Sequence, residues 1–301
     1  MKNRRILFLL LICLAFIAVT LSETISFLAH PVPAAPSGGF DGARAYQDVL
    51  AQSAFGPRVP DSPAHAQAVA YITRELASAG WSASVQTQEI GGHSAQNILA
   101  TRGSQAPAIL LGAHYDSRLW ASNDPDPLKQ HSPVPGADDG ASGVAVLLEI
   151  ARTLPKDSAP VWLVFFDIED NGEIPGWDWL LGSKAFADSL VVKPKAVVIL
   201  DMIGDADLNI YMEKNSDEEY TRQIWDTAAK LGYDKAFIPQ YKYQVEDDHL
   251  PFIQKGLRAV DIIDLDYPYW HTVQDTADKV SAGSLSIVGT TLLTWIKSFP
   301  K

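Results

Sequence analysis

The chain has 301 residues, of which 47% are hydrophobic, and this supplies a core for one large α/β domain or two small ones. Its net charge of −12 excludes nucleic acid as a partner, because no basic stripe is present to neutralise phosphates. The only cysteine, Cys13, lies in the first apolar run, which excludes disulfide and thiol chemistry from the rest of the chain.

The N-terminal segment, residues 1–29, is predicted to be a signal peptide or a membrane anchor. Lys2, Arg4 and Arg5 precede the apolar run 6–21, and this order is typical of secretory signals and short signal anchors. No small-residue cleavage site directly follows the run, which favours an uncleaved anchor. The positive residues then place the rest of the chain outside the cytoplasm, so a periplasmic or secreted protein is expected.

The remaining chain is predicted to consist of a Pro- and Gly-rich linker, residues 30–39, and one folded domain, residues 40–301. Apolar periodicity and capping signals predict helices over residues 42–54, 62–79, 141–154, 216–232, 247–256 and 281–299. Asp61 or Ser62 is expected to cap the second of these helices. Alternating or continuous apolar runs predict strands over residues 81–90, 94–103, 106–114, 159–170, 194–201 and 256–266. This alternation predicts a single-domain α/β fold, an αβα sandwich around a mostly parallel, mixed sheet.

Acidic and histidine residues stand at the ends of three predicted strands and in two turns. They are His114, Asp139, Glu169, Asp170, Asp201 and His271. The carboxyl ends of parallel strands share one rim of a sheet, where α/β proteins bind ligands. Carboxylate and imidazole ligands without cysteine favour a catalytic zinc over a structural one.

Each of these residues also has a simpler structural interpretation. Asp138 and Asp139 begin a helix, so one of them can be an N-cap. We expect Asp139 to bind the metal and Asp138 to cap the helix or to support Asp139. His114 can be a core histidine paired with Asp116, and Asp201 can cap a turn.

Two acidic segments are interpreted in the same way. Glu169 and Asp170 are adjacent, and neighbours in an extended chain point to opposite sides. We therefore expect one to bind metal and the other to carry protons, unless both form an exposed acidic turn. In residues 246–249, EDDH, one side chain is expected to cap the short helix that follows, which leaves an acid to face the same rim.

Several other enzyme classes are excluded by missing motifs. The sequence has no GxSxG for a serine hydrolase, no GxxxxGK[ST] or GxGxxG for nucleotide chemistry, and no HExxH for a helix-borne zinc site.

Taken in order, a set of segments resembles the zinc peptidases of family M28 and the glutaminyl cyclases that share their fold. These segments are GAHYDS, PGADDGASGVA, FFDIED, LLGS, LDMIG, DDHLPF and WHTVQDT, and the resemblance covers about residues 55–298. It implies one of two activities. The di-zinc aminopeptidases hydrolyse N-terminal residues from peptides, whereas the cyclases keep a single zinc and convert N-terminal glutamine to pyroglutamate with release of ammonia.

The resemblance implies a metal-binding role for five residues. A single zinc would be held by Asp139, Asp170 and His271. In a di-zinc aminopeptidase, His114 and Asp201 would complete the second metal site. In a cyclase, the same two residues would lie behind the single metal, so ligand counting leaves both activities open.

The resemblance also implies the residues that act on substrate. Glu169 would carry protons, and Asp201 and Asp247 would hold the γ-amide nitrogen of the substrate. Trp270 and Glu246 would contact the substrate. Nearby aromatic residues are expected to complete the wall of the pocket, and the candidates are Trp120, Trp177 and Trp179.

Three features favour the cyclase branch. Asp247 matches a catalytic aspartate of the cyclases, Trp270 matches their pocket tryptophan, and the segment EDDHLPF resembles theirs. Three residues depart from the animal cyclases: Asp170 replaces Glu, as in bacterial members, Glu246 replaces Gln, and Asp261 replaces a histidine of the pocket. These departures leave the fine substrate preference open.

The sequence therefore predicts a zinc-dependent glutaminyl-peptide cyclotransferase that acts on peptide or protein N-termini. A family M28 aminopeptidase is the alternative. A metal-free binding ectodomain is a third interpretation, but such relatives typically lose ligands, and none is lost here. The membrane would be contacted only through the N-terminal segment.

Overall fold

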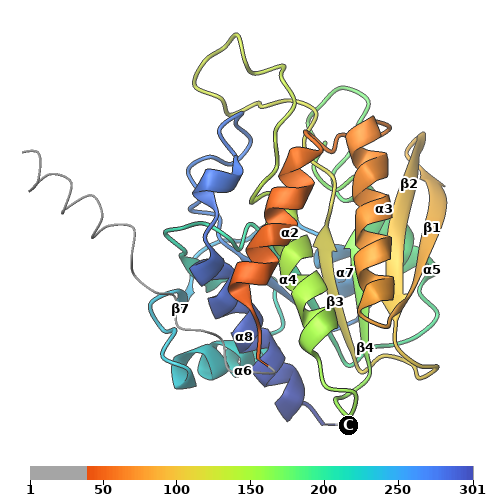
Figure 1. Ribbon diagram of the computed structural model, residues 1–301, viewed down its shortest axis with the longest axis vertical. Helices are drawn as coiled ribbons and strands as arrows, with labels where there is room; N and C mark the ends of the chain where they lie inside the picture. Colours follow the sequence, from red (N-terminus) through yellow and green to blue (C-terminus); the bar gives the residue numbers. More distant parts are fainter. Residues whose placement is uncertain (1–38, 301) are drawn as a thin grey trace, which may run out of the picture. The chain divides into compact units, whose positions relative to one another are not determined.

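A six-stranded mixed sheet forms the centre of the domain in the computed structural model, which describes residues 39–300 (Figure 1). The predicted N-terminal anchor, and all but the last residue of the predicted linker, lie outside the described residues. In sheet order, the strands are β1 (Ser82–Ile90), β2 (His93–Thr101), β4 (Val161–Phe166), β3 (Ile109–His114), β5 (Ala196–Asp201) and β8 (Ala259–Ile263). β1, β2 and β4 pair antiparallel, and the last four strands are parallel. The predicted mostly parallel, mixed sheet is confirmed.

Helices cover both faces of this sheet. One face carries α2 (Gly42–Ala54), α3 (Pro63–Ser78), α4 (Ala141–Thr153), α6 (Glu218–Lys230) and α8 (Ala282–Ser298), which pack on the larger hydrophobic core. The other face carries α5 (Leu181–Ser189) and α7 (Leu250–Gln254), around Phe166, Phe186 and Phe252. Strands buried on both faces explain the continuous apolar runs of β3, β4 and β5. Within residues 39–300, no helix has both the length and the apolar character needed to cross a membrane.

The structure corrects several predicted elements. β4 ends at Phe166, so Glu169 and Asp170 lie in the following loop and not at the strand end. Helix α5 was not predicted, because nine residues carry too little periodicity. A small parallel sheet of β6 (Ile210–Met212) and β7 (Phe237–Tyr241) was also missed, as was the 3-10 helix Ala277–Lys279.

The predicted cap is confirmed at α3, the cap alternative for Asp138 is excluded at α4, and the predicted cap is wrong at α7. Ser62 caps α3 by accepting the His65 N–H at 3.1 Å. α4 has no side-chain cap, because Asp138 instead accepts the backbone N–H of Gly204 at 2.7 Å. α7 also has no side-chain cap, so no acid of the EDDH segment is used in this way.

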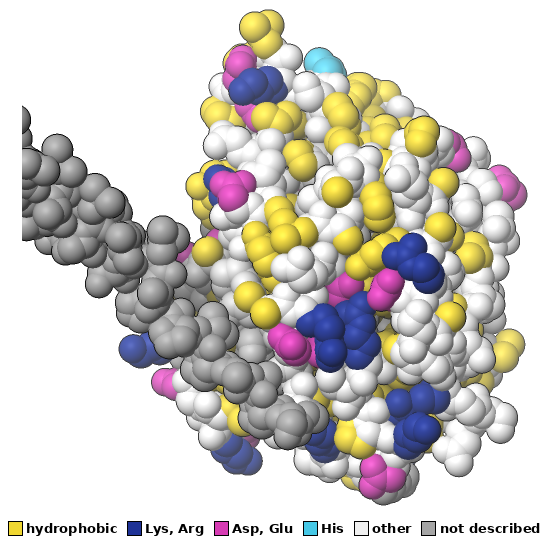
Figure 2. Space-filling model, in the orientation of Figure 1, with side chains coloured by type: hydrophobic (Ala, Val, Ile, Leu, Met, Phe, Trp, Pro, Cys, Tyr) yellow, Lys and Arg dark blue, Asp and Glu magenta, His cyan; other side chains and the backbone are white. Residues whose placement is uncertain are grey.

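Ion pairs tie three helices together on the face that α2 and α3 cover. Arg152 of α4 donates to Asp48 of α2 at 2.9 Å and to Glu75 of α3 at 3.0 Å. Figure 2 shows this face, where Lys and Arg side chains form separate groups, several of them beside Asp or Glu.

A close helix–strand contact sets the position of the rim that carries the candidate residues. A Cβ atom on Gly143 of α4 would lie 2.5 Å from the carbonyl oxygen of Leu200 in β5. Because glycine has no side chain, α4 packs directly on β5. The start of α4 and the carboxyl end of β5 are thereby brought together.

Candidate metal centre and active site

Three neighbouring parallel strands deliver polar residues to one rim of the sheet, as predicted. His114 is the last residue of β3 and Asp201 is the last residue of β5, while Glu169 and Asp170 follow β4. The strand order β4-β3-β5 places the three chain segments side by side.

Glu169 and Asp170 both line one pocket, and they do so from a loop and not as neighbours in an extended strand. The chain turns after β4 at Ile168, whose φ of 52° lies in the left-handed region. Asp116 fixes the turn, because its carboxylate accepts the backbone N–H of Glu169 at 3.1 Å. The alternation of side chains along a strand therefore does not apply here.

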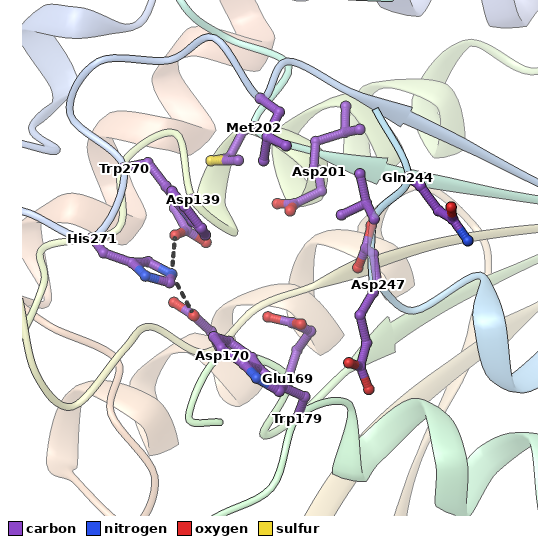
Figure 3. Close-up of a pocket in the computed structure, with 14 residues that line it drawn as sticks. Asp139, Glu169, Asp170, Trp179, Asp201, Met202, Gln244, Asp247, Trp270 and His271 are labelled. Atoms are coloured by element: carbon purple, nitrogen blue, oxygen red, sulfur yellow. Dashed lines mark ion pairs between the residues drawn. The ribbon is translucent and has the colours of Figure 1, made fainter. Parts of the chain in front are cut away.

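Asp139, Asp170 and His271 form the first group that can hold a metal ion (Figure 3). One ligand atom of each residue lies within 4.8 Å of the others. His271 Nε2 lies 2.8 Å from Asp170 Oδ1 and 3.7 Å from Asp139 Oδ2. Asp139 Oδ2 and Asp170 Oδ2 are buried without a hydrogen-bond partner. Orphaned carboxylate oxygens beside an imidazole fit a zinc ion.

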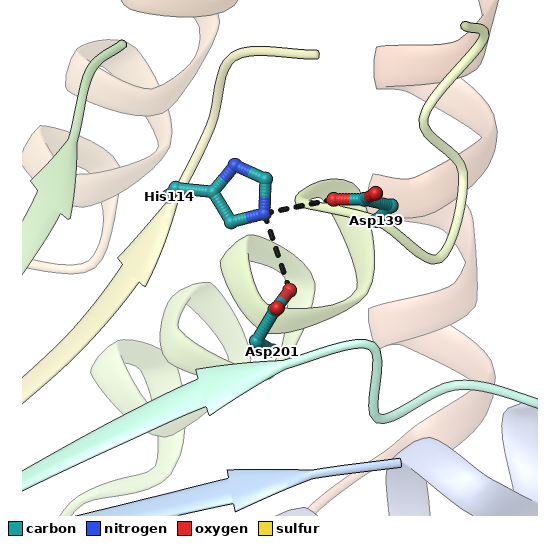
Figure 4. A group of neighbouring side chains, drawn as sticks. All are labelled: His114, Asp139 and Asp201. Carbon is teal, nitrogen blue, oxygen red and sulfur yellow. Dashed lines mark hydrogen bonds and ion pairs between the residues drawn. The ribbon is translucent and has the colours of Figure 1, made fainter. Parts of the chain in front are cut away.

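His114, Asp139 and Asp201 form a second group of the same kind (Figure 4). His114 Nε2 lies 3.1 Å from Asp139 Oδ1 and 3.2 Å from Asp201 Oδ1. Its other ring nitrogen lies 3.3 Å from Asp116. The two groups share Asp139, so the five predicted residues converge on one place.

Residues that the sequence did not single out hold these groups in position. The Asp275 carboxylate accepts the backbone N–H groups of Asp138 at 2.9 Å and of Asp139 at 3.2 Å. Arg118 donates to the backbone oxygen of Asp170 at 3.0 Å, and its guanidinium lies over the Trp179 ring. These contacts join residues distant in the chain, so no local pattern could reveal them.

Burial governs the ionisation of the first group. Removal from water raises the pKa of Asp170 to about 7 and lowers the pKa of His271 to about 3. Burial, together with the carboxylate of Asp170, also raises the pKa of Glu169 well above its ordinary value, although His114 opposes this. A neutral imidazole is the form that binds metal, and a divalent cation would favour ionised carboxylates beside it.

The pocket next to these groups is small and partly apolar. It has a volume of about 230 Å³, below the usual range for drug-sized ligands. Its lining includes the acids Glu169, Asp201, Glu246 and Asp247, the tryptophans Trp179 and Trp270, and the apolar residues Met202, Val245, Ile263 and Leu265.

Trp179 was among the three candidate aromatic residues, and its place in the pocket wall is confirmed. The other two candidates lie outside the lining of this pocket. Trp120 packs on His131, and Trp177 stacks on His93. Asp261, the predicted departure from the animal cyclases, is fully buried next to His249 and does not line the cavity.

Comparison with known proteins assigns the family. Residues 97–296, more than half of the chain, match the sequence profile of peptidase family M28. The chain belongs to this family. Members of known structure share its fold across nearly the whole described region.

The similar structures carry the names of both activities. A glutaminyl cyclase from Tannerella forsythia is 35% identical, with a TM-score of 0.81 over 87% of this chain and 100% of that one. A leucine aminopeptidase precursor from Bacteroides thetaiotaomicron is 32% identical, with a TM-score of 0.83 over 87% and 98%. A Zn-dependent exopeptidase from Parabacteroides distasonis is 32% identical, with a TM-score of 0.83 over 88% of this chain and 100% of that one. Overall likeness therefore shows a family M28 enzyme and does not choose between the reactions.

Proposed function

We propose that the protein is a zinc-dependent glutaminyl-peptide cyclotransferase, which converts the N-terminal glutamine of peptides or proteins to pyroglutamate with release of ammonia. The observation that carries the proposal is the position of Asp247. Its carboxyl group lines the same small pocket as Glu169, Asp201 and Trp270. An acid at this place has no use in activating water for hydrolysis, but it can hold the amide nitrogen of a glutamine side chain.

The reaction needs no external nucleophile, so the main task of the enzyme is proton transfer. The α-amine of the substrate attacks its own γ-amide carbon, a C–N bond forms, and the bond to the amide nitrogen breaks. Glu169 takes the proton that the attacking α-amine nitrogen loses as the C–N bond forms, and it returns this proton to the leaving nitrogen, which departs as ammonia. The α-amine and the γ-amide carbon are already close to each other, because both belong to one glutamine residue.

Asp139, Asp170 and His271 are the residues that would hold the zinc. When bound, zinc supplies a Lewis acid for the γ-carbonyl oxygen. Asp201 and Asp247 hold the γ-amide nitrogen, so that the leaving group stays next to Glu169. Because these carboxyl groups are close together, they share protons and titrate as a set.

The pocket walls suit one side chain of glutamine size. Trp270 and Trp179 form flat apolar walls, and Glu246 adds an exposed acid to the lining. A cavity of this size, with apolar walls and several acids, orients a small substrate and excludes water from the reacting atoms.

An aminopeptidase of family M28 is the second candidate function. It is favoured by the geometry of His114 and Asp201, which complete a second metal group around Asp139. Hydrolysis would use two metal ions to activate a water molecule.

One experiment separates the two functions. The purified protein is incubated with a Gln-initiated peptide and, separately, with Leu- and Ala-arylamides, while zinc per chain is measured. We expect the peptide to lose the mass of one ammonia molecule, with about one zinc per chain. Release of free amino acids, with about two metal ions per chain, would contradict the cyclase and support the peptidase.

We also propose that the catalytic domain works outside the cytoplasm, tethered by residues 1–29. The proposal is supported by the order of basic and apolar residues at the start of the chain. Protease added to spheroplasts, from which any outer membrane has been removed, should digest the domain, whereas protection until the spheroplasts are lysed would contradict it.

A further inference from the structure

Asp247 is the pocket end of a line of four buried polar side chains. From the far end toward the pocket, they are Glu213, His249, Asp261 and Asp247, and none is more than 2% exposed. Glu213, His249 and Asp261 belong to neither of the two metal groups that share Asp139. We call these four residues the buried polar line.

Glu213 ends the line as an ionised acceptor. Its carboxylate accepts the N–H groups of Asn215 and Ser216, each at 2.8 Å, and that of Val245 at 3.0 Å. Ser216 also donates its hydroxyl at 2.9 Å. Burial would raise the pKa of Glu213, but the His249 imidazole and the N–H groups lower it below its ordinary value. A carboxylate with this many donors carries no proton of its own.

His249 follows, with one acid on each side of its ring. Nε2 lies 3.4 Å from Glu213 Oε2, and Nδ1 lies 3.7 Å from Asp261 Oδ2. Among the described residues, neither nitrogen has a hydrogen-bond partner. Because Glu213 can only accept, the ring proton belongs on Nε2. The lone pair of Nδ1 then points to Asp261.

Asp261 joins His249 to the pocket. It lies in β8, and neither of its carboxylate oxygens accepts an N–H or O–H group from a described residue. Carboxylate oxygens of Asp261 and Asp247 lie within 4.8 Å of each other, and this contact favours the proton on Asp261, from which it can be donated to Asp247. Burial and the carboxylates of Asp247, Asp201 and Glu213 raise the pKa of Asp261 well above its ordinary value. A carboxyl group among these acceptors is stable when it keeps a proton to donate.

We propose that Asp261 is a positioning residue that holds the Asp247 carboxyl group in the pocket by a hydrogen bond, and that His249 and Glu213 hold Asp261 in turn. The effect on turnover rests on the proposed function, because it requires Asp247 to contact the substrate. The alternative is that a cation binds between these side chains, since Asp247, His249 and Asp261 also offer ligand atoms within 4.8 Å of one another.

Two substitutions of Asp261 separate positioning from a structural role. Asp261→Asn keeps a donor for Asp247, and Asp261→Leu removes it at similar volume. With a Gln-initiated peptide, we expect kcat of Asp261→Leu to fall about 10- to 100-fold with little change in KM, because a misplaced contact costs this much. We expect Asp261→Asn to keep kcat within about threefold of the parent, because one hydrogen bond is replaced by another.

The melting temperature shows whether a loss of kcat is only a loss of folding. Leucine removes one member of a buried polar network and leaves its partners unpaired, which usually lowers stability. We expect Asp261→Leu to melt at a lower temperature than the parent but to remain folded at the temperature of the assay, so that its kcat is measured on folded protein. Full activity of Asp261→Leu would overturn the proposal, as would an equal loss of activity in both variants.

Zinc per chain tests the cation alternative. We expect the parent and Asp261→Leu to bind the same amount of zinc. The loss of one metal ion from Asp261→Leu would show a cation at this place and would overturn the proposal.

An imidazole ¹⁵N spectrum tests the line without any assay of activity, with the His249 signals assigned through His249→Gln. We expect a proton on Nε2 and an unprotonated Nδ1, whose signal shifts in Asp261→Leu because the neighbouring carboxyl group is lost. A proton on Nδ1 would overturn the proposal. If the parent protein does not cyclise Gln-initiated peptides, the proposed function fails, while this spectrum still decides how Asp261 is held.

Discussion

Glu169 and Asp170 are neighbours in the chain with different surroundings. Asp170 is tied to His271 at 2.8 Å and to Arg118 at 3.4 Å. The Glu169 carboxylate faces the cavity (Figure 3). One acid is therefore restrained beside a histidine, as a metal ligand needs to be, and the other is placed to exchange protons with a substrate.

Replacement of Glu169 by Gln removes the proton carrier and keeps its shape. We expect turnover to fall by roughly 10²–10⁴-fold, the usual contribution of a general acid–base group. Zinc content, measured by metal analysis, should be unchanged. A loss of zinc would mean that Glu169 is a ligand and that its assigned role is wrong.

Replacement of His271 by Ala removes the only imidazole of the first metal group. We expect zinc and activity to be lost together, because two carboxylates alone leave the site short of ligands. His131, an exposed histidine that packs on Trp120, provides the matched control. His131→Ala should keep both zinc and activity, and a fully active His271→Ala would remove His271 from the site.

At the scale of elements, the contact between α4 and β5 sets the spacing of the metal groups. A Cβ atom on Gly143 would meet the Leu200 oxygen at 2.5 Å and the Ala113 Cβ atom at 2.9 Å. α4 carries Asp139 just before its first residue, and β5 ends in Asp201. A shift of α4 therefore moves one candidate ligand away from another.

Gly143→Ala should force this shift. We expect a loss of about 1–3 kcal/mol in the free energy of unfolding, as for other overpacked cores, together with weaker zinc binding. Gly283→Ala in the first turn of α8 is the control, because its Cβ atom would meet nothing closer than 3.4 Å. The control should be neutral or stabilising by up to about 1 kcal/mol. Equal effects of the two substitutions, measured by urea unfolding and zinc titration, would contradict the argument.

The end of β8 gives the domain a pH-sensitive contact at Asp264. Its carboxylate accepts the N–H of Asn209 at 2.6 Å and of Asp266 at 3.0 Å. Burial outweighs these bonds and raises the pKa of Asp264 from 3.8 to about 6. The folded state thus binds this proton more tightly than the unfolded state. The resulting stability is present below pH 3.8 and is lost as the pH rises through about 6.

Asp264→Asn should remove this part of the pH dependence. Urea unfolding across the window from pH 3.8 to about 6 should show a shallower fall in the free energy of unfolding than in the parent protein. An identical slope in the two proteins would show that Asp264 does not titrate in this range.

At the scale of the whole molecule, the first metal group joins three separate segments. Asp139 precedes α4, Asp170 follows β4, and His271 lies in the loop after β8. A bound ion would therefore cross-link parts of the chain that no single element connects, and a metal that binds only the folded state stabilises that state.

Removal of metal should lower both activity and stability. We expect a chelator to abolish turnover and to lower the melting temperature. The corresponding free energy is about 2.7 kcal/mol if zinc is present at a hundred times its Kd. Added zinc should restore both. Chelator-treated protein that works and melts like the untreated protein would contradict a metal centre.

The local features of this protein could be predicted from its sequence. Ser62 as the cap of α3, the buried runs of β3 and β5, and the set of six candidate residues all depend on short stretches of neighbouring residues. Helical periodicity, caps and apolar runs act over a few residues, so they can be recognised in the sequence alone. The order of the motifs was enough to indicate the family.

Only the tertiary structure decided how these parts meet. The left-handed turn at Ile168 sends Glu169 and Asp170 into one pocket, and Arg118 and Asp275 support the metal groups from distant segments. The buried polar line from Glu213 to Asp247 also joins separate elements. Such contacts depend on the order of strands in the sheet and on the packing of α4 against β5, and neither is encoded in any short run of residues.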